Sequence, residues 1–389
     1  MTIEQIKLVH FRNYDQMTIL PHEGINIFFG QNGSGKTNLL EAIHYCALGK
    51  SHRINQDTGA VMMGEAGCSC QMSVRNQYSR NDIEVRLRPG EENVKSVWID
   101  QKKAARLSEM MGVLRCVIFS PEDLSLIKEG PSIRRKFLDM MISQISRNYF
   151  VSLQQYRAAM SQRAAILRQA KIDYTRPDPM IVDFEMAMVG HAKVIYQERV
   201  KYTEMLSTIG HQLYQQISGK DTEDFIIHYR SQLPSEENDP LFLKKLLEKQ
   251  REDDMRQGST QSGPHRDDLI LTLNGKHMKS FASQGQIRTA ALSLKLAQMK
   301  IFTRITNEYP ILLLDDVMSE LDLNRRMNLL DIVSGVQTFI TCSDEGDLAE
   351  YQNNRTYHVH NPEGIAQVEL IKEGPDMHKL KFSEEPVFE

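Results

Sequence analysis

The stretch GQNGSGKT at residues 30–37 constrains the fold more than any other part of the sequence. It matches the pattern G-x-x-x-x-G-K-[ST] in full, and it lies between a β-prone run, GINIFFG, and a helical stretch from about 38 to 48. The glycines let the backbone curl so that successive N–H groups face one anion, and the helix that follows points the positive end of its dipole there. The pattern therefore predicts a phosphate-binding loop between a strand and a helix.

The residues of this loop predict nucleotide binding with a metal ion. We expect Lys36 to reach the β- and γ-phosphates and the Thr37 hydroxyl to bind Mg²⁺. The other expected phosphate-binding residues of the loop are Gly30, Gln31, Asn32, Gly33, Ser34 and Gly35. A glycine-rich turn with a chance lysine is the alternative, but the flanking strand and helix disfavour it. ATP and Mg²⁺ are the cofactors that the loop predicts.

The stretch ILLLDD at 311–316 predicts the second half of a magnesium site. Its apolar residues are typical of a strand buried on both faces of a parallel sheet, and such a strand delivers its last residues to the edge where ligands bind. We expect Asp315 to bind the ion through water and Asp316 to orient the attacking water as a general base. An acidic strand end is common by itself, but beside a phosphate loop it predicts ATP hydrolysis with Lys36 and Asp316 as catalytic residues.

A second helix opening, FASQGQIRTAALSLKLAQ, occupies residues 281–298. Ser283, Gly285 and Gln286 can present a hydroxyl, backbone N–H groups and a helix dipole to an anion, although an ordinary N-cap would look the same. The turn precedes ILLLDD by roughly thirty residues, and this order resembles that of ABC-type ATPases. In that class the turn of one subunit closes on the γ-phosphate held by another. SELD at 319–322 matches the loop that follows the magnesium strand, so we expect an ATP-dependent homodimer.

The distribution of strand and helix patterns predicts an α/β ATPase head interrupted by a helical insertion. Residues 1–125 are expected to form the N-terminal half of the head with the phosphate loop. Residues 126–258 show a helical pattern, broken at RPDP (176–179) and again at 232–240, which predicts a short inserted arm. Residues 259–389 return to α/β character and carry the signature turn and the magnesium strand. The expected fold class is an ABC/SMC-type P-loop ATPase head with a mostly helical arm domain.

The composition is that of a cytoplasmic protein with no membrane span. The net charge of −4 neither demands nor excludes a nucleic-acid partner, because DNA binding needs a local basic patch. No apolar run reaches the length of a membrane span. The five cysteines are odd in number and include no C-x-x-C pair, so we expect neither a disulfide framework nor a zinc site. Cys68-x-Cys70 and His358-x-His360 alternate as metal ligands can, but in both we favour ordinary strand positions.

A run of cations in the expected arm is the candidate DNA contact. Between residues 140 and 172 the chain has no Asp or Glu, and the expected phosphate-contacting residues are Arg147, Arg157, Arg163, Arg168 and Lys171. A solvated helix face is the alternative interpretation. No aromatic stacking cluster or recognition helix is evident, so binding is expected to follow the DNA backbone and the junction shape.

With these motifs the chain resembles the RecF family, bacterial DNA replication and repair proteins of the ABC/SMC-type ATPase class. The resemblance covers nearly the whole length. Beyond the stretches above it includes FRNY (11–14), SHR (51–53), FSPEDL (119–124), RRKFLD (134–139) and GPHRDDL (263–269). Ile287 and Cys342 depart from it, because more polar residues are expected there.

The resemblance implies a recombination mediator that dimerises on ATP and binds single- and double-stranded DNA at gapped junctions. It implies RecO and RecR as partners and help for RecA in replacing single-strand-binding protein. Hydrolysis is then slow, and ATP acts as a dimerisation switch. Arg12 matches a position that contacts the nucleotide in related heads, and Arg53 is a weaker candidate.

Four alternatives differ from this interpretation. A transporter subunit is disfavoured because Ala282 precedes the signature serine and TCSD follows the last strand of the core. A chromosome-structural SMC protein needs far longer arms. A small-molecule kinase or GTPase is the third alternative, and the sequence lacks the N-K-x-D motif that reads guanine. A clamp that binds ATP and DNA with negligible turnover stays open.

Overall fold

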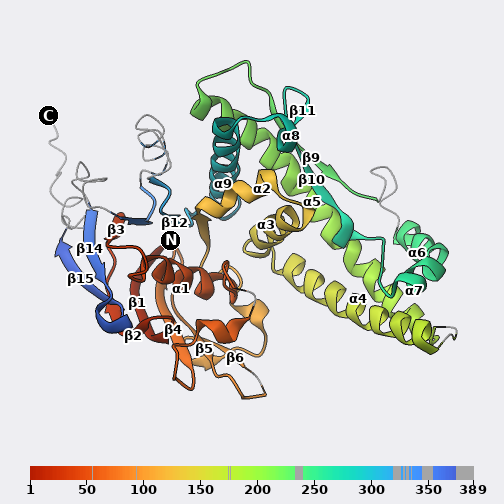
Figure 1. The fold of residues 1–389 in the computed structure, drawn as a ribbon, viewed down its shortest axis with the longest axis horizontal. Helices are drawn as coiled ribbons and strands as arrows, with labels where there is room; N and C mark the ends of the chain where they lie inside the picture. Colours follow the sequence, from red (N-terminus) through yellow and green to blue (C-terminus); the bar gives the residue numbers. More distant parts are fainter. Residues whose placement is uncertain are drawn as a thin grey trace. The chain divides into compact units, whose positions relative to one another are not determined.

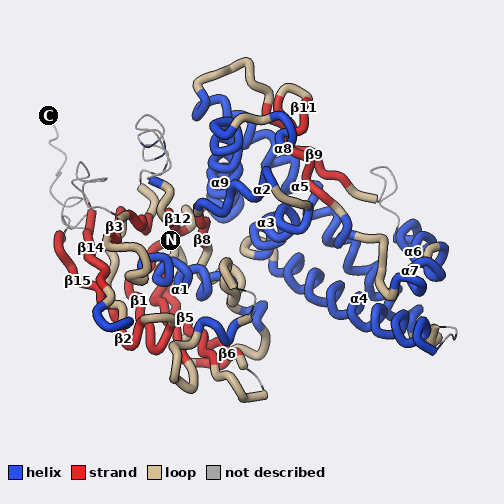
Figure 2. Tube along the Cα trace, viewed as in Figure 1, coloured by secondary structure: helices blue, strands red, loops and turns tan. Residues whose placement is uncertain are grey.

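The computed structural model describes residues 1–54, 56–92, 94–173, 177–232, 240–318, 335–343 and 354–373, together with Thr175, Arg326, Leu329 and Val333. The chain forms two compact units (Figures 1 and 2). The first unit comprises Met1–Asp123 and Phe302–Glu389, and the second comprises Leu124–Ile301. Both α-helices and β-sheets are present, as the sequence predicts. No helix among the described residues is both long and apolar enough to span a bilayer.

A largely parallel six-stranded sheet forms the base of the first unit. Its strand order is β15-β14-β3-β13-β12-β8, and all neighbours except β14 and β15 are parallel. The strands are β3 (Ile25–Phe29), β8 (Cys116–Phe119), β12 (Ile311–Asp315), β13 (Thr338–Cys342), β14 (Asn354–His360) and β15 (Gln367–Lys372). Every residue of β12 and β13 is buried, which for β12 confirms the prediction of a strand covered on both faces.

An antiparallel sheet forms the second layer of this unit, in the order β2-β1-β4-β5-β6-β7. Its strands are β1 (Thr2–Phe11), β2 (Tyr14–Ile19), β4 (Cys68–Arg75), β5 (Arg80–Leu87), β6 (Lys95–Ile99) and β7 (Lys102–Lys103). Cys68 and Cys70 are alternate buried residues of β4, and all five cysteines are buried thiols outside any disulfide. The strand interpretation of that pair is confirmed.

Helix α1 (Lys36–Leu48) contacts strands of both sheets, among them β4 and β5 on one side and β8 and β12 on the other. Eleven of its thirteen residues are buried, so it is part of the core on all sides. The helix ends at Gly49, whose left-handed conformation lets its N–H donate to the Tyr45 carbonyl. This burial fixes the first residues of the helix, Lys36 and Thr37, relative to both sheets.

The second unit is mostly helical. Its helices are α2 (Ser125–Lys128), α3 (Pro131–Ser143), α4 (Arg147–Asp173), α5 (Ile181–Ser218), α6 (Pro240–Lys249), α7 (Arg251–Gln257), α8 (Met278–Phe281) and most of α9 (Gln284–Thr306). Helices α4 and α5 pack along each other, and the chain leaves the first of them just before the predicted break at RPDP (Figure 1). The helices predicted on either side of that break are therefore present.

A small sheet in this unit was not predicted. Strand β9 (Phe225–Arg230) lies within the stretch expected to be helical and pairs antiparallel with β10 (Asp268–Leu273), which also pairs with β11 (Lys276–His277). The compact unit that contains this sheet runs from Leu124 to Ile301. The expected domain boundaries at 125 and 258 stay predictions.

Buried ion pairs hold this unit together and explain two of its motifs. Arg134 of RRKFLD donates two hydrogen bonds to Asp268 of GPHRDDL, at 2.8 and 2.9 Å. Arg199 of α5 donates to Asp139 at 2.7 Å and to the Pro264 carbonyl at 2.7 Å. Removing one partner of such a pair strongly destabilises the fold, since the charge of the other partner stays buried. The two motifs therefore fasten the sheet to α3 and α5.

Candidate functional site

The phosphate loop joins β3 to α1 and depends on its first and last glycines. Gly30 has a φ of +151°, and a Cβ there would lie 2.0 Å from the Val359 carbonyl oxygen of the neighbouring strand β14. Gly35 has a φ of +121°, and its Cβ would lie 2.9 Å from the Ala366 side chain. Both positions combine a left-handed backbone with no room for a side chain. The glycines are therefore needed for packing as well as for access of an anion to the backbone.

Lys36 is the first residue of α1 and lies folded against the loop. Its ammonium donates to the carbonyl of Gly30 at 2.5 Å and to that of Gln31 at 2.8 Å. Burial lowers the pKa of Lys36, while the nearby charges of Asp316 and Asp315 act to raise it. The loop carbonyls thus hold the charge where the phosphates of a nucleotide are expected.

Thr37 and Asp315, the two predicted magnesium ligands, are in direct contact. The Thr37 hydroxyl donates to Oδ1 of Asp315 at 2.8 Å, and the Thr341 hydroxyl of β13 donates to the same oxygen at 2.8 Å. Asp315 is 6% exposed, and burial raises the pKa of its carboxyl although both hydroxyls oppose the rise. A hydroxyl and a carboxylate side by side are the hard oxygen ligands that Mg²⁺ takes, so these residues fit the ion.

Asp316 follows β12 in a left-handed conformation, with φ of +54°. Its backbone N–H donates to the Thr341 hydroxyl at 2.9 Å. Non-glycine residues adopt this conformation at some energetic cost, typically where the surrounding contacts require it. Thr341 therefore fixes both Asp315 and the turn that carries Asp316. Sequence reasoning missed Thr341, although its place at the end of the adjacent strand TFITC is the signal that could have found it.

Arg12 and Arg53 meet at one buried carboxylate. Arg12 donates to Glu41 of α1 at 2.7 and 3.0 Å and to the Gly59 carbonyl at 2.7 Å. Arg53 lies 3.7 Å from the same carboxylate and donates to Asn38 at 3.1 Å, and the Ser51 hydroxyl also donates to Glu41. Glu41 is fully buried, so these cations neutralise it. Glu41 was not predicted, although a carboxylate within the apolar run LLEAI of the helix could have marked it.

The residues after Arg12 support the loop from its other side. The Asn13 amide donates to the Ser34 carbonyl at 3.2 Å, and the Tyr14 hydroxyl donates to the Gly35 carbonyl at 3.1 Å. Asn38 in turn donates to the Asn13 side chain at 2.8 Å. FRNY thus contributes Arg12 to the Glu41 cluster and two hydrogen-bond donors to the loop backbone.

The signature turn belongs to the second compact unit, whereas the phosphate loop belongs to the first. Ser283 is exposed, and its hydroxyl accepts from the Gln286 N–H at 3.3 Å while the Gln286 side chain accepts from the Ser283 N–H at 2.9 Å. This reciprocal capping box fixes the start of α9. Gln286 also donates to Glu223 at 3.0 Å. The turn is a rigid, exposed helix opening, with Gly285 half-buried within it.

The two departures from the family pattern have a structural reason, and one motif cannot be placed. Ile287 is 5% exposed and Cys342 is 2% exposed, so both apolar side chains lie in the core. The SELD stretch, 319–322, lies outside the described residues.

One expected DNA contact is wrong. Arg163 is fully buried in the second unit, where it donates to Asp254 at 2.7 Å and to Thr260 at 2.9 Å and lies 3.0 Å from Glu185. The carboxylates come from α5 and α7, so the absence of acidic residues along α4 itself did not reveal them. A guanidinium with these partners is closed to DNA.

The other four cations of α4 are exposed: Arg147, Arg157, Arg168 and Lys171. Arg157 pairs with Asp139 at 2.8 Å and lines a cavity of about 240 Å³ together with Arg135 and Lys136. Exposed cations fit contacts to a phosphate backbone.

Comparisons with known proteins agree with this geometry. Residues 2–365 match the family RecF/RecN/SMC N terminal domain. The DNA replication and repair protein RecF of Clostridium botulinum (strain Alaska E43 / Type E3) is 40% identical over 362 residues, covering 92% of this chain and 97% of that protein. RecF of Lactobacillus johnsonii is 38% identical over 368 residues, covering 92% of this chain and 97% of that protein.

Solved structures give the same result. A structure of the recombination mediator protein RecF with ATP in the RecFOR pathway has a TM-score of 0.86 and 34% identity, covering 95% of this chain and 97% of that one. An Smc head bound to a domain of ScpA has a TM-score of 0.57 at 16% identity, over 98% of this chain and 99% of that one. The second likeness shows the fold alone, which is that of an ABC/SMC-type ATPase head.

Replacing Asp315 by asparagine tests the burial of the carboxylate. Because burial raises its pKa, the folded state binds the proton more tightly, and ionisation destabilises the fold as the pH rises from about 3.9 through the folded-state pKa. Asp315→Asn removes this effect and leaves an oxygen for the Thr37 and Thr341 hydroxyls. We expect the nucleotide-free variant to be more stable at neutral pH by about 1 kcal/mol, the usual size of one buried polar contact.

Thermal unfolding between about pH 4 and pH 8 measures the effect, which should shrink towards the acidic end. The half-buried neighbour provides the matched control, since Asp316→Asn should show no comparable gain. A destabilised Asp315→Asn variant, or a difference independent of pH, would contradict the prediction.

Proposed function

The chain belongs to the RecF/RecN/SMC N-terminal domain family, as a member of its RecF group, and we propose that it is an ATP-dependent DNA-binding recombination mediator. The observation that carries the proposal is the contact between Thr37, beside the phosphate loop, and Asp315, at the end of β12. That contact unites two stretches of sequence nearly 280 residues apart into one nucleotide site. ATP and Mg²⁺ are the proposed ligands.

We assign the roles at this site as follows. The loop backbone from Gly30 to Gly35 binds the phosphates. The Lys36 ammonium gives up its hydrogen bonds to the loop carbonyls and binds the β- and γ-phosphates instead. Thr37 and Asp315 hold the magnesium ion, which supplies charge stabilisation on the phosphates when bound. Asp316 orients the attacking water as a general base, and hydrolysis is weak. Arg12 contacts the nucleotide, although in the nucleotide-free chain its guanidinium is held by Glu41 and the Gly59 carbonyl.

ATP acts in this proposal as a switch for dimerisation. The signature residues Ser283, Gly285 and Gln286 of one copy contact the γ-phosphate held by the other. The capped helix opening supports this role, because the two hydrogen bonds fix it without a ligand and Ser283 at the start of the helix is exposed. One chain by this proposal supplies only half of each site.

The dimer binds DNA at gapped junctions, through single and double strands, and acts with RecO and RecR to help load RecA in the cytoplasm. Exposed cations on α4 make phosphate contacts, namely Arg147, Arg157, Arg168 and Lys171. Structures of the related RecF protein are described within the RecFOR pathway, which supports these partners. Contacts of this kind give shape recognition with little sequence preference.

The signature role is tested by Ser283→Arg. The added side chain should block approach of a second copy, so ATP-dependent dimerisation is lost while ATP binding to the monomer is retained. Analytical ultracentrifugation with and without ATP and Mg²⁺, with nucleotide affinity measured separately, checks both parts. Ser280→Arg, at an exposed position three residues earlier, should still dimerise, and Lys36→Met should lose both activities. A Ser283→Arg protein that dimerises with ATP would disprove the contact in trans.

The role of Asp316 is tested by single-turnover hydrolysis with and without gapped DNA. Asp316→Asn should slow hydrolysis by about 10²-fold or more, because the general base is lost, and should prolong the ATP-bound dimer. If the wild-type chain itself shows no turnover with gapped DNA, the clamp without turnover becomes the correct function.

The DNA contact is tested by the double variant Arg168→Ala/Lys171→Ala. Each lost phosphate contact should reduce the slope of log K against log salt by about 0.9, or by about 1.8 for both. Fluorescence anisotropy with gapped DNA at several salt concentrations measures the slope. Lys193→Ala, an exposed lysine on α5, serves as the control and should leave it unchanged. An unaltered slope in the double variant would move the DNA surface elsewhere.

A further inference from the structure

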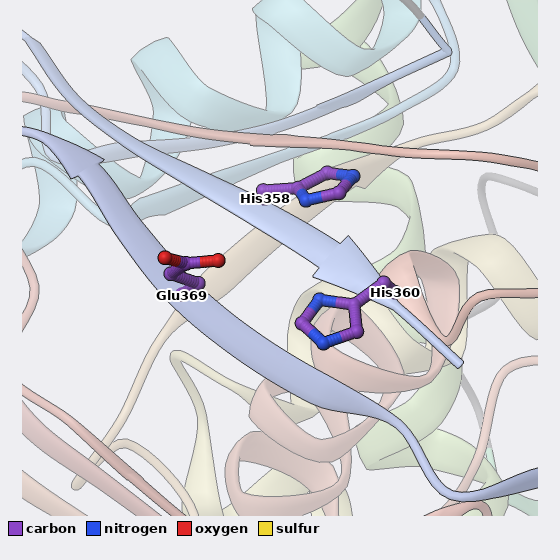
Figure 3. Close-up of side chains that lie close together, drawn as sticks. All are labelled: His358, His360 and Glu369. Carbon is purple, nitrogen blue, oxygen red and sulfur yellow. The ribbon is translucent and has the colours of Figure 1, made fainter. Parts of the chain in front are cut away.

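Three side chains with metal-binding atoms gather on the hairpin of β14 and β15. His358 and His360 come from β14 and Glu369 from β15, and one ligand atom of each lies within 4.8 Å of the others (Figure 3). His358 is the direct cross-strand partner of Glu369, and His360 is that of Gln367. Among the residues that the structure describes, this is the only such group of three. The alternation that the sequence shows thus gains a third ligand from the neighbouring strand.

The hydrogen bonds of His360 leave one ring nitrogen available for a metal. Nε2 lies 3.1 Å from the side-chain oxygen of Gln367, and an amide oxygen only accepts, so Nε2 carries the hydrogen. Nδ1 then has the lone pair, and this atom is buried without a hydrogen-bond partner. Metal-bound histidines usually have this arrangement, in which the outer N–H is held by an acceptor and the inner nitrogen faces the ion.

The ring of His358 is also restricted. It stacks on Phe29 of β3 with ring centroids 4.9 Å apart and on His360 at 5.4 Å. Both histidines are half-buried, whereas Glu369 is exposed. The site therefore has two imidazoles of limited freedom and one carboxylate that can move towards them from solvent.

We propose that His358, His360 and Glu369 bind one divalent transition-metal ion of the zinc class. Two imidazoles and a carboxylate are typical ligands of zinc and its neighbours, whereas Mg²⁺ and Ca²⁺ prefer oxygen alone. Bonds of about 2.0–2.2 Å bring tetrahedral ligand atoms to roughly 3.5 Å from one another. Small side-chain rotations, chiefly of Glu369, bring the three ligand atoms to this spacing. Water takes the fourth coordination position of the ion.

The ion would act on the nucleotide site through the hairpin. Besides the Val359 carbonyl against Gly30, the Asn361 amide donates to the Gly33 carbonyl at 3.3 Å, and the Ala366 N–H donates to the Asn13 carbonyl at 2.7 Å. Both ends of the turn between β14 and β15 thus contact the loop or its support. A metal ion bound to both strands restricts the motion of the hairpin. It therefore favours the conformation of the phosphate loop that binds ATP. This coupling between the two sites rests on the proposed ATP binding, whereas the metal site itself is independent of it.

The site is tested by calorimetric titration of the metal-free, full-length chain with Zn²⁺ in the absence of nucleotide. We expect one ion per chain, with affinity at least about 100-fold weaker in His358→Ala and His360→Ala. Gln367→Leu, which removes the partner of Nε2, should weaken binding about 10–100-fold. His228→Ala, an exposed histidine of β9, should bind as wild type, and so should Lys36→Met. Co²⁺ should give the visible spectrum of nitrogen and oxygen ligands, without thiolate charge transfer.

The absence of saturable Zn²⁺ binding, or binding unchanged in both histidine variants, would overturn the site. Coupling is measured as ATP affinity in Mg²⁺ with and without Zn²⁺. A several-fold gain should appear in the wild type and vanish in His360→Ala, since linked sites affect each other by the same factor. Equal ATP affinity in both conditions would overturn the coupling. Failure of ATP binding itself would refute the proposed function and leave the Zn²⁺ titration unaffected.

Discussion

The proposed nucleotide site of the first unit depends on one buried carboxylate that accepts hydrogen bonds from two hydroxyls. Oδ1 of Asp315 joins the end of β12 to Thr37 of α1 and Thr341 of β13. The Thr341 hydroxyl also accepts a hydrogen bond from the Asp316 N–H. A carboxylate is expensive to bury without partners, so the hydroxyls make its position tolerable in the absence of a metal. The resulting arrangement places a hydroxyl and a carboxylate side by side, which are the oxygen ligands that we propose for Mg²⁺. The site is organised by the core, and the ligand completes it.

Sequence reasoning succeeded where an element depends on a short stretch in a recognisable context. GQNGSGKT lies between the strand β3 and the helix α1, and ILLLD is the buried strand β12, because glycine turns, strand ends and helix starts are local features. It failed where partners come from distant parts of the chain. Glu41 receives Arg12 and Arg53, and Thr341 reaches Asp315 through strand register, neither of which a local pattern shows.

Arg163 and β9 illustrate the same limit in the second unit. Along α4 the arginine looks like one cation among five, yet helices α5 and α7 supply the carboxylates that bury it. The run FIIHYR is short and lies in a helical context, and its partner β10 follows almost forty residues later. Long-range pairing decided both outcomes, whereas helical periodicity along the chain predicted the helices of this unit before and after the break at 232–240.

The strand order of the parallel sheet has a consequence for how the chain is made. β3, which leads into the phosphate loop, lies between β13 and β14, so both of its neighbours come from residues 338–360. During synthesis from the N-terminus, this strand has no partner on either side until most of the polypeptide has left the ribosome. The residues of the loop come early in the sequence, but the strands that pair with β3 are synthesised late. A chain that stops before β13 would contain every residue of the loop and neither of the two strands that pair with β3.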